Sequence, residues 1–505
     1  MMVLLLEHPR VIAPERRNDI ANTPLTSCLL TGYVAGVLKR EGHDVDIVEG
    51  YLDNLSYAEI AERVKAMAPD LLGVHMVYQW QRDQLLFDFL EGLKTAGVVS
   101  YIAVYGYYPT FAFETILQEC RAIDGVVVGE PELTFAELAS RLSRGADTEN
   151  IPGLAWRDAG GKIRCTRRGL VNDLDQLPFP VRTGAMMRLP EINIQGSRGC
   201  YGGCTFCYIN PFYGQGSHWR GRSPENIVAE IDEIIAKWGK RDFYFTDPNF
   251  FGPGERGQRR ALHLASLLKS RNISFGIEAR VNDIHDETIG ALVEAGLRHI
   301  LIGLESGRDE SLKRLNKMTT VAQNEEALRI LRRHGIEPNV GFIMFEPGST
   351  LQDVRTNFEF LKRNLLLDNL AVTANLLYHY QIILKGTPAF QKLVSEGRLK
   401  VSEDSYEGVV LYENEGVACL AEVMRRITNF LFARMAGVWS GRVKPPAGAP
   451  EIYKKVNSLL VECFETLLTA LESGEHLNEE ERDKFARRNE LKMAELLATI
   501  PGGDI

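Results

Sequence analysis

Three cysteines within eight residues constrain this 505-residue chain more than any other feature of its sequence. Cys200, Cys204 and Cys207 have the spacing Cys-x3-Cys-x2-Cys in a glycine-rich loop, directly after a predicted strand at Glu191–Gln195. Such a loop can wrap a compact iron–sulfur cluster and turn backbone N–H groups toward its sulfur atoms. A [4Fe–4S] cluster has four irons, so three cysteines leave one iron free for an exogenous chelator, and the amine and carboxylate of an amino acid suit it.

Two other interpretations of the cysteine loop stay open at this point. A structural zinc ion needs four Cys or His ligands, and His218 is the available fourth ligand. Alternatively, the three could be unrelated buried thiols. The remaining cysteines are scattered singly, which is typical of free thiols in a reducing cytoplasm: Cys28, Cys120, Cys165, Cys419 and Cys463.

Composition narrows the class of protein. Hydrophobic residues make up 45% and charged residues 25% of the chain, as in ordinary globular proteins. The net charge of −9 argues against a protein that binds nucleic acid through phosphate contacts. The apolar run Met2–Leu6 is too short for a leader or a membrane span, so we expect a buried first strand and a cytoplasmic protein.

Residues 1–145 alternate apolar strand patterns with amphipathic helical patterns. This alternation predicts a Rossmann-like, doubly wound parallel sheet, which would bind ligands at the carboxyl ends of its strands. The predicted strands are Val3–Leu6, Val45–Val48, Leu71–Met76, Tyr101–Tyr105 and Gly125–Val128. Residues 146–190 are rich in proline and glycine turns and are interpreted as a linker.

The strand–helix alternation resumes over residues 191–395 and predicts a partial (β/α)6 barrel, so the fold class is α/β. The predicted barrel strands are Glu191–Gln195, Phe243–Phe245, Ser274–Ile277, His299–Ile302 and Val340–Phe345. Residues 396–505 form a predicted helical C-terminal domain, with helices at Ala418–Met435, Glu451–Glu472 and Asn478–Ala498.

The cysteine loop, with Phe206 before its last cysteine, resembles the signature of the radical S-adenosylmethionine (SAM) superfamily. The resemblance extends over about residues 190–395. Further segments similar to the family's motifs are Arg222–Glu225, Phe245–Phe250, Glu278–Arg280, Gly303–Gly307 with Leu315–Lys317, and Gly341–Gly348.

The resemblance implies that Cys200, Cys204 and Cys207 bind a [4Fe–4S] cluster, which reductively cleaves SAM to a 5′-deoxyadenosyl radical. That radical would abstract hydrogen from an unactivated C–H bond of a small molecule, with electrons from a donor such as flavodoxin or ferredoxin. The implied SAM contacts are Phe206 beside the cluster, Asp247 for the amine, Arg280 for the carboxylate, Glu278 or Glu305 for the ribose, and Phe345 near the adenine.

The amino-terminal region resembles the cobalamin-binding subclass of this superfamily, on the segment Val128–Glu132. The resemblance implies cobalamin at the carboxyl edge of the sheet, held without a histidine ligand because the Asp-x-His-x-x-Gly motif is absent. The subclass usually has two glycines after the fourth strand, whereas this chain has Gly106 followed by Tyr107. Tyr107, together with Tyr78 and Trp80, could stack on a corrin or fill its space.

The cofactor would decide the reaction. With cobalamin, the resemblance favours methyl transfer to carbon or phosphorus, as in antibiotic and other natural-product biosynthesis. Without it, the alternative is radical dehydration, deoxygenation or epimerisation of a sugar-type substrate such as an aminoglycoside. A tyrosine would then supply the final hydrogen, with Tyr213 the candidate ahead of Tyr208 and Tyr378. His379 and Lys385 could line the substrate pocket or be structural. A non-catalytic metal-binding scaffold is the third hypothesis, and we expect neither nucleic acid nor membrane as a partner.

Overall fold

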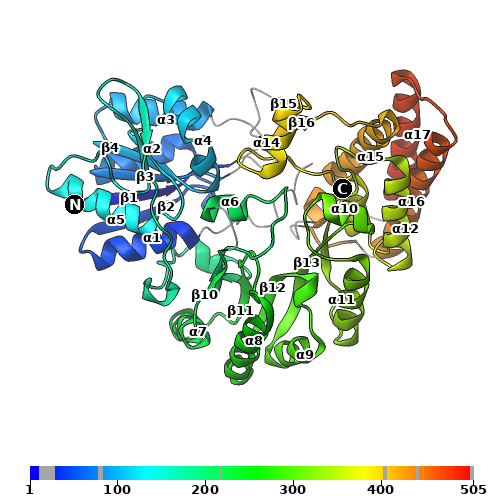
Figure 1. Ribbon diagram of the computed structural model, residues 1–505, viewed down its shortest axis with the longest axis horizontal. Helices are drawn as coiled ribbons and strands as arrows, with labels where there is room; N and C mark the ends of the chain where they lie inside the picture. Colours follow the sequence, from blue (N-terminus) through cyan, green and yellow to red (C-terminus); the bar gives the residue numbers. More distant parts are fainter. Residues whose placement is uncertain are drawn as a thin grey trace.

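The structure is a computed structural model that describes residues 1–10, 29–77, 84–214, 218–401, 407–439, 443–446 and 448–500. Three parts surround a common centre: an amino-terminal α/β domain in blue and cyan, a green barrel, and carboxyl-terminal helices in orange and red (Figure 1). Tyr78 and Trp80 lie outside the described residues.

The amino-terminal sheet has the strand order β2-β1-β3-β4-β5, with all five strands parallel. This is a doubly wound order, as predicted, and its strand order reverses between β1 and β3. The strands are β1 (Met2–Glu7), β2 (Asp44–Glu49), β3 (Leu71–His75), β4 (Tyr101–Tyr105) and β5 (Gly125–Val127). The covering helices are α1 (Leu29–Arg40), α2 (Tyr57–Met67), α3 (Gln84–Thr95), α4 (Tyr107–Glu119) and α5 (Glu132–Ser143).

The segment interpreted as a linker contributes to this sheet. A hairpin of β6 (Leu154–Arg157) and β7 (Ile163–Cys165) pairs antiparallel to β5 and extends the sheet to seven strands. The turn between them contains Gly160 and Gly161, and Gly161 has a φ of +78°. The hairpin therefore covers the outer edge of β5, which would otherwise expose unpaired backbone groups.

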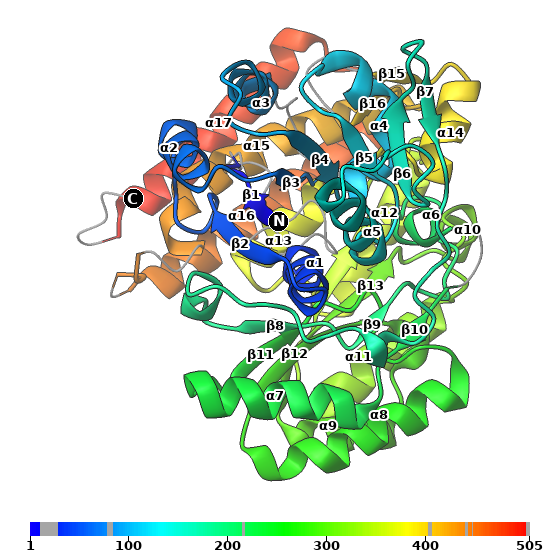
Figure 2. The same ribbon diagram turned by 90° about the vertical axis from the view of Figure 1, so that its left-hand side faces the viewer.

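Two glycines let the rest of the linker pack tightly on helix α1. A Cβ at Gly32 would lie 2.7 Å from the carbonyl oxygen of Val181, and one at Gly36 would lie 3.0 Å from that of Phe179. Only glycine leaves room for this approach, which also allows the Val181 N–H to donate to the Gly32 carbonyl at 3.0 Å. Helix α1 is thereby fixed between the amino-terminal sheet and the barrel (Figure 2).

The second sheet is parallel throughout, in the order β14-β13-β12-β11-β8. Five strands are continuous, and the sixth position of the predicted partial barrel is marked by a single parallel bridge between Phe345 and Tyr380. The strands are β8 (Ile192–Ile194), β11 (Asp242–Phe245), β12 (Ser274–Arg280), β13 (Leu297–Glu305) and β14 (Asn339–Phe342). The helices are α7 (Pro224–Trp238), α8 (Gly254–Leu268), α9 (Asp286–Ala295), α10 (Asp309–Arg314), α11 (Val321–Arg333), α12 (Leu351–Arg363) and α13 (Leu370–Tyr378).

Helix α7 shows how the sequence sets the element boundaries. Ser223 caps its first turn by accepting a hydrogen bond from the Asn226 N–H at 3.2 Å, and Pro224 occupies the first helical position. The helix ends at Gly239, which adopts the left-handed conformation with φ +68°.

The carboxyl-terminal helices are α15 (Glu415–Trp439), α16 (Ala449–Glu472) and α17 (Glu479–Ala498), close to the predicted ranges. They share one continuous hydrophobic core with the barrel, so this region packs on the barrel rather than forming a separate core. Helix α14 (Pro388–Ser395) and a small hairpin of β15 (Leu399–Val401) and β16 (Gly408–Val410) precede them.

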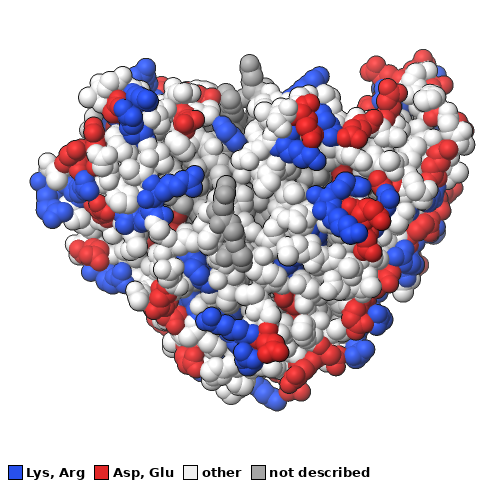
Figure 3. All heavy atoms as spheres, viewed as in Figure 1, with Lys and Arg blue, Asp and Glu red and all other residues white. Residues whose placement is uncertain are grey.

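Among the described residues, no helix is both long and apolar enough to span a membrane. Figure 3 shows acidic and basic side chains mixed around the rim of one face, with no large area of a single sign.

Candidate active site

The three cysteines of the loop face one cavity. Cys200, Cys204 and Cys207 lie between β9 (Ser197–Arg198) and α6 (Ile209–Tyr213), and all three line a cavity of about 700 Å³ inside the barrel. The cavity lies at the carboxyl-terminal end of the parallel strands, where sheets of this kind bind ligands.

The segment after β13 clamps the cysteine loop in place. The Thr205 N–H donates to the Leu315 carbonyl at 3.0 Å, and the Asn316 side-chain amide donates to the Gly203 carbonyl at 2.7 Å. Asn316 has a φ of +50°, a left-handed conformation that asparagine tolerates better than most residues. The loop is therefore held by backbone and amide contacts that leave its sulfur atoms directed to the cavity.

The surroundings of the thiols suit an anionic cluster. Burial raises the pKa of the Cys200 and Cys207 thiols, which disfavours isolated thiolates at these positions. The positive charge of Arg280 opposes this effect on the pKa of Cys200. Arg280 Nη1 also donates a hydrogen bond to Cys204 Sγ at 3.5 Å. The Gly202 N–H donates to Cys200 Sγ at 3.3 Å, as backbone groups do around iron–sulfur clusters.

A single metal ion fits this loop less well than a cluster does. Within the described ranges, no group of three Cys, His, Asp or Glu side chains is close enough to hold one metal ion. Three thiols around a shared cavity instead leave room for a larger body between them. The donor set and the neighbouring cations thus fit a [4Fe–4S] cluster with one iron free of protein thiolate.

Charged side chains gather beside the cysteines. Lys317 Nζ lies 2.7 Å from Glu305 Oε1, and the Arg280 guanidinium donates to the Lys317 carbonyl. Arg280 Nε is buried without a hydrogen-bond partner among the described residues. Glu305 has a φ of +64°, which is rare for a residue other than glycine and is often found at functional sites. An unsatisfied guanidinium N–H next to the cluster loop fits the carboxylate of SAM.

A second carboxylate enters the cavity without a cation. Glu278 lies on β12, and its hydrogen-bond partner in the described structure is the Tyr244 hydroxyl at 3.1 Å. Burial raises the pKa of Glu278 to about 8, with the charge of Asp247 adding to the effect. Such a carboxylate can accept more hydrogen bonds than the one from Tyr244, and the hydroxyl groups of a ribose would supply them.

The structure places the predicted site residues in two groups. Phe206, Glu278, Arg280 and Glu305 line the cavity together with the three cysteines. Asp247 does not: it is fully buried and accepts hydrogen bonds from the Gly196 N–H at 2.6 Å and the Ser197 hydroxyl at 2.8 Å. These contacts place Asp247 under the start of the cysteine loop.

Phe345 and Tyr213 also lie outside the cavity lining. Phe345 is fully buried against Phe464 of α16, at a centroid distance of 6.3 Å, while its neighbours Phe342 and Ile343 line the cavity. Tyr213 packs on Phe212 with the Arg220 guanidinium 5.1 Å from its ring centroid. Its hydroxyl is buried with no hydrogen-bond partner in the described ranges.

Tyr213 belongs to an ionic cluster between the amino-terminal domain and the barrel. Arg198, fully buried two residues before Cys200, pairs with Glu130 at 2.9 Å and Glu132 at 2.6 Å. Arg220 pairs with Glu130 from the other side at 2.9 Å. Burial alone would raise the pKa of Glu130, but Arg198 and Arg220 hold it below its usual value. The charges of this cluster therefore neutralise one another.

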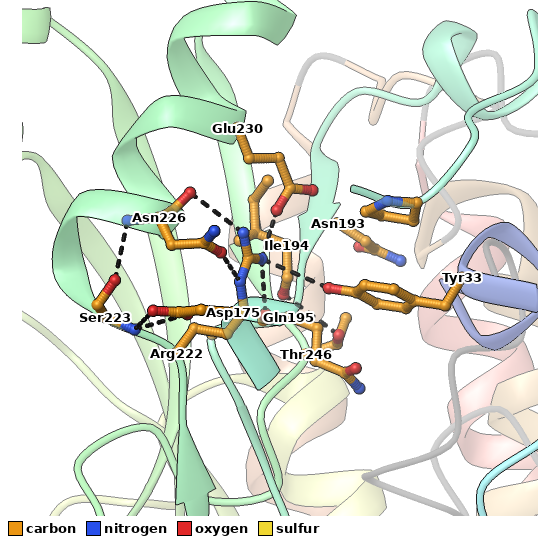
Figure 4. Close-up of polar contacts among 12 residues, drawn as sticks. Tyr33, Asp175, Asn193, Ile194, Gln195, Arg222, Ser223, Asn226, Glu230 and Thr246 are labelled. Atoms are coloured by element: carbon orange, nitrogen blue, oxygen red, sulfur yellow. Dashed lines mark hydrogen bonds and ion pairs between the residues drawn. The ribbon is translucent and has the colours of Figure 1, made fainter. Parts of the chain in front are cut away.

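A second network joins three parts of the chain around Arg222 (Figure 4). Arg222 pairs with Glu230 of α7 and donates to the Gln195 carbonyl at 3.0 Å and to the Tyr33 hydroxyl of α1 at 3.4 Å. In the same view, Asp175 of the linker accepts from the Ser223 N–H at 3.0 Å. Strand β8, helix α1 and the linker are thus tied to the start of α7.

Sequence reasoning did not select several polar residues of the cavity, among them Lys317 and Tyr244. Lys317 was part of a recognised motif but was assigned no role, and Tyr244 lies between buried Phe243 and Phe245. The alternation in β11 was the available signal for Tyr244, because side chains next to each other in a strand face opposite sides.

A barrel with three cysteines around a polar cavity, joined to a doubly wound domain, defines a radical SAM enzyme with a cobalamin-type domain. The sequence model of the radical SAM superfamily matches residues 194–361, and that of the B12 binding domain matches residues 30–139. The chain therefore carries a radical SAM domain over residues 194–361 and a B12-binding-type domain over residues 30–139.

Similar proteins agree with this assignment. The chain is 28% identical over 374 residues to an uncharacterized methyltransferase of Pyrococcus horikoshii, an alignment that covers 72% of this chain and 78% of that protein. It is 26% identical to an anaerobic magnesium-protoporphyrin IX monomethyl ester cyclase of Rubrivivax gelatinosus, over 65% of this chain and 61% of that protein. Its fold matches the cobalamin-dependent SAM radical enzyme OxsB with aqua-cobalamin bound, with a TM-score of 0.72, 20% identity, and coverage of 97% and 84%.

Proposed function

We propose that this enzyme transfers a methyl group from SAM, by way of cobalamin, to a carbon or phosphorus atom of a small molecule. The main support is the contact between the cysteine loop and the carboxyl edge of the B12-type sheet. Helix α6 begins two residues after Cys207. Tyr107 follows β4 and Gly106, and its ring centroid lies 4.9 Å from that of Tyr208 and 4.6 Å from that of Phe212.

The carboxyl edge has features that suit a corrin. Gly129, after β5, has open space where a side chain would begin, and its N–H donates to Thr110 Oγ1 at 3.0 Å. Buried polar residues lie at the strand ends beside the reversal of strand order, among them Glu7 of β1 and His75 of β3, 3.0 Å apart. We propose that cobalamin lies over these strand ends, where it would carry the methyl group between SAM and the substrate.

The residues of the cavity would hold SAM. Arg280, with an unsatisfied Nε, would bind the carboxylate, and Glu278 would accept hydrogen bonds from the ribose. The Glu305–Lys317 pair would order the polar groups beside the free iron. When bound, the cluster would supply the electron that cleaves SAM to a 5′-deoxyadenosyl radical, and the walls of the cavity would limit the access of water to it.

One observation favours a second candidate function. Tyr107 stands where the subclass has its second glycine, and its buried ring fills part of the space between the sheet edge and α6. A domain that lacks cobalamin for this reason would support radical dehydration, deoxygenation or epimerisation of a sugar-type substrate instead.

One experiment distinguishes the two reactions. The protein would be reconstituted without oxygen with iron, sulfide and hydroxocobalamin, then given a reductant and SAM. Methyl transfer predicts bound corrinoid and both 5′-deoxyadenosine and S-adenosylhomocysteine by mass spectrometry. 5′-Deoxyadenosine without corrinoid or S-adenosylhomocysteine would support the second function and contradict the first.

We also propose a cellular compartment and an electron donor for the enzyme. Free cysteines and a thiolate-bound cluster suit a reducing cytoplasm with a flavodoxin or ferredoxin as electron donor. We also propose the domain division 1–145, 146–190, 191–395 and 396–505, with the β6–β7 hairpin serving the first domain.

A further inference from the structure

Helix α13 and the chain after it form a wall of the cavity that carries no charged side chain, unlike the part of the lining that contains Arg280 and Glu305. One face of α13 lines the cavity, and the chain that follows continues the same wall. The lining residues of this wall are Ala371, Val372, Asn375, Leu376, His379, Tyr380, Ile382 and Leu384. Their spacing in α13, at i, i+1, i+4 and i+5, is that of one helix face.

This wall lies outside the part of the chain that the radical SAM sequence model matches, which ends at residue 361. The shared chemistry of the superfamily thus resides in the strands before it, while residues 370–384 follow the segment that the model matches. A wall of this kind is where substrate recognition is expected to differ between members of a superfamily.

The formal charges of the lining come from the barrel strands and the segment after β13. Within the described lining of the cavity, the charged side chains are Glu278, Arg280, Glu305 and Lys317, all of them on or after β12 and β13. Residues 370–384 contribute aliphatic, amide, imidazole and phenol groups to the lining, and no charged group. An ionised substrate group placed against this wall would lose its hydration without gaining a counter-ion, which costs several kcal/mol.

Two polar groups on the wall remain available to a ligand. Asn375 Oδ1 is buried with no hydrogen-bond partner among the described residues. The His379 imidazole has no hydrogen-bond partner among the described residues, whereas the His379 backbone carbonyl accepts from the Met344 N–H at 2.9 Å. Burial lowers the pKa of His379 to about 4, so the ring is neutral and offers one donor and one acceptor.

From these observations we infer that α13 and the chain after it form the substrate wall, which selects an uncharged, largely apolar substrate and positions it through His379 and Asn375. This inference rests on the proposed function, since it assumes that SAM occupies the charged end of the same cavity. It excludes substrates that place a phosphate, carboxylate or ammonium group against this wall.

The test compares three probes that share one ring: cyclohexanecarboxamide, cyclohexanecarboxylate and cyclohexylmethylammonium. Calorimetric titration of each into the anaerobically reconstituted enzyme with SAM bound would measure affinity. We expect the neutral amide to bind at least tenfold more tightly than either ion. Equal or tighter binding of an ion, or no saturable binding of the amide up to its solubility limit, would overturn the inference.

Variants identify the residues responsible. His379→Leu is expected to weaken amide binding about five- to tenfold, because one hydrogen bond is lost. His379→Gln retains a donor and an acceptor and should restore most of that loss, whereas a merely structural role for His379 predicts no rescue. His334→Leu, at the partly buried residue that follows α11 and lies outside the cavity lining, is the matched control and should bind the amide like the parent enzyme.

The outcomes separate this inference from the proposed function. A preference for the amide without formation of S-adenosylhomocysteine would refute methyl transfer and leave the substrate class standing. Formation of S-adenosylhomocysteine together with tighter binding of an ion would support methyl transfer and refute the substrate class.

Discussion

The cavity and the domain interface both bury many charges, but they satisfy them differently. At the interface, Arg198 has Glu130 and Glu132 as partners, and each carboxylate is paired. In the cavity, Arg280 keeps an unsatisfied Nε and Glu278 faces a tyrosine hydroxyl instead of a cation. Since a buried charge without a counter-ion is costly, a ligand is expected to complete the set in the cavity. At the interface each charged group already faces an opposite charge, although Glu132 Oε2 and the Tyr213 hydroxyl lack a hydrogen-bond partner among the described residues.

The largest effect is expected at the cysteine loop. Cys204→Ala should abolish formation of 5′-deoxyadenosine and lower the iron bound after reconstitution, because a cluster with two protein thiolates is not retained. Iron analysis and mass spectrometry would check this result. Cys165→Ala, in β7 and away from the cavity, is the control and should leave both values unchanged. Undiminished turnover by the Cys204 variant would refute its role as a ligand.

Breaking the interface should cost stability. Arg198→Gln leaves Glu130 and Glu132 close together with one cation fewer, so the free energy of unfolding should fall by about 3–5 kcal/mol. Urea unfolding followed by circular dichroism would measure it. Arg259→Gln removes an exposed pair with Glu255 and should have little effect. Equal stability of the two variants would mean that the interface charges are solvated.

A substitution in the cavity should change the affinity of the enzyme for SAM. Glu278→Gln should weaken SAM binding about tenfold, the loss expected for a hydrogen bond to a charged acceptor. SAM needs the ionised carboxylate, so the affinity of the parent enzyme should rise with pH through about 8, the pKa of Glu278. Equilibrium dialysis between pH 7 and 9 would measure both, and an equal slope in the Gln variant would exclude Glu278 as the titrating group.

The same substitution should change stability in the opposite direction. The folded enzyme keeps a proton on Glu278 up to about pH 8, whereas the unfolded chain loses it near the ordinary value of 4.5. The free energy of unfolding contributed by this group therefore falls as pH rises between these values. Glu278→Gln should melt above the parent enzyme at pH 9 and show a smaller difference at pH 5, as followed by scanning calorimetry.

The smallest effect is expected at Tyr213. Its hydroxyl belongs to the interface cluster and not to the cavity, so Tyr213→Phe should change the unfolding free energy by less than about 1 kcal/mol. Product analysis by mass spectrometry should show no change in turnover. A loss of product without a loss of 5′-deoxyadenosine would restore Tyr213 as a hydrogen donor.

Local patterns predicted much of this arrangement. The cysteine spacing and the positions of Glu278, Arg280 and Glu305 near strand ends were sufficient to predict that these residues line one cavity. The reason is that parallel strands bring their carboxyl ends to one edge of the sheet. The same rule does not tell which way a buried side chain turns. Asp247 also follows a strand, yet it turns to the Gly196 and Ser197 side of the loop.

Contacts between distant segments could not be predicted from local patterns. Tyr213 lies beside an ionic cluster whose carboxylates come from residues 130–132, some 80 residues earlier in the chain. The substrate wall depends on how α13 packs against the barrel. In the sequence, the apolar residues of α13 cannot be distinguished from those of an ordinary hydrophobic core. His379 was noticed in the sequence, but only the cavity shows that its ring lies on the wall.

Electron paramagnetic resonance of the reduced enzyme, before and after addition of SAM, tests the central claim most directly. If one iron lacks a protein thiolate, and if SAM supplies the missing partners of the charged groups in the cavity, the spectrum of the reduced cluster must change when SAM binds. The parent enzyme should show this shift, with a tenfold higher SAM requirement in Glu278→Gln. A four-iron signal that does not respond to saturating SAM would contradict the account.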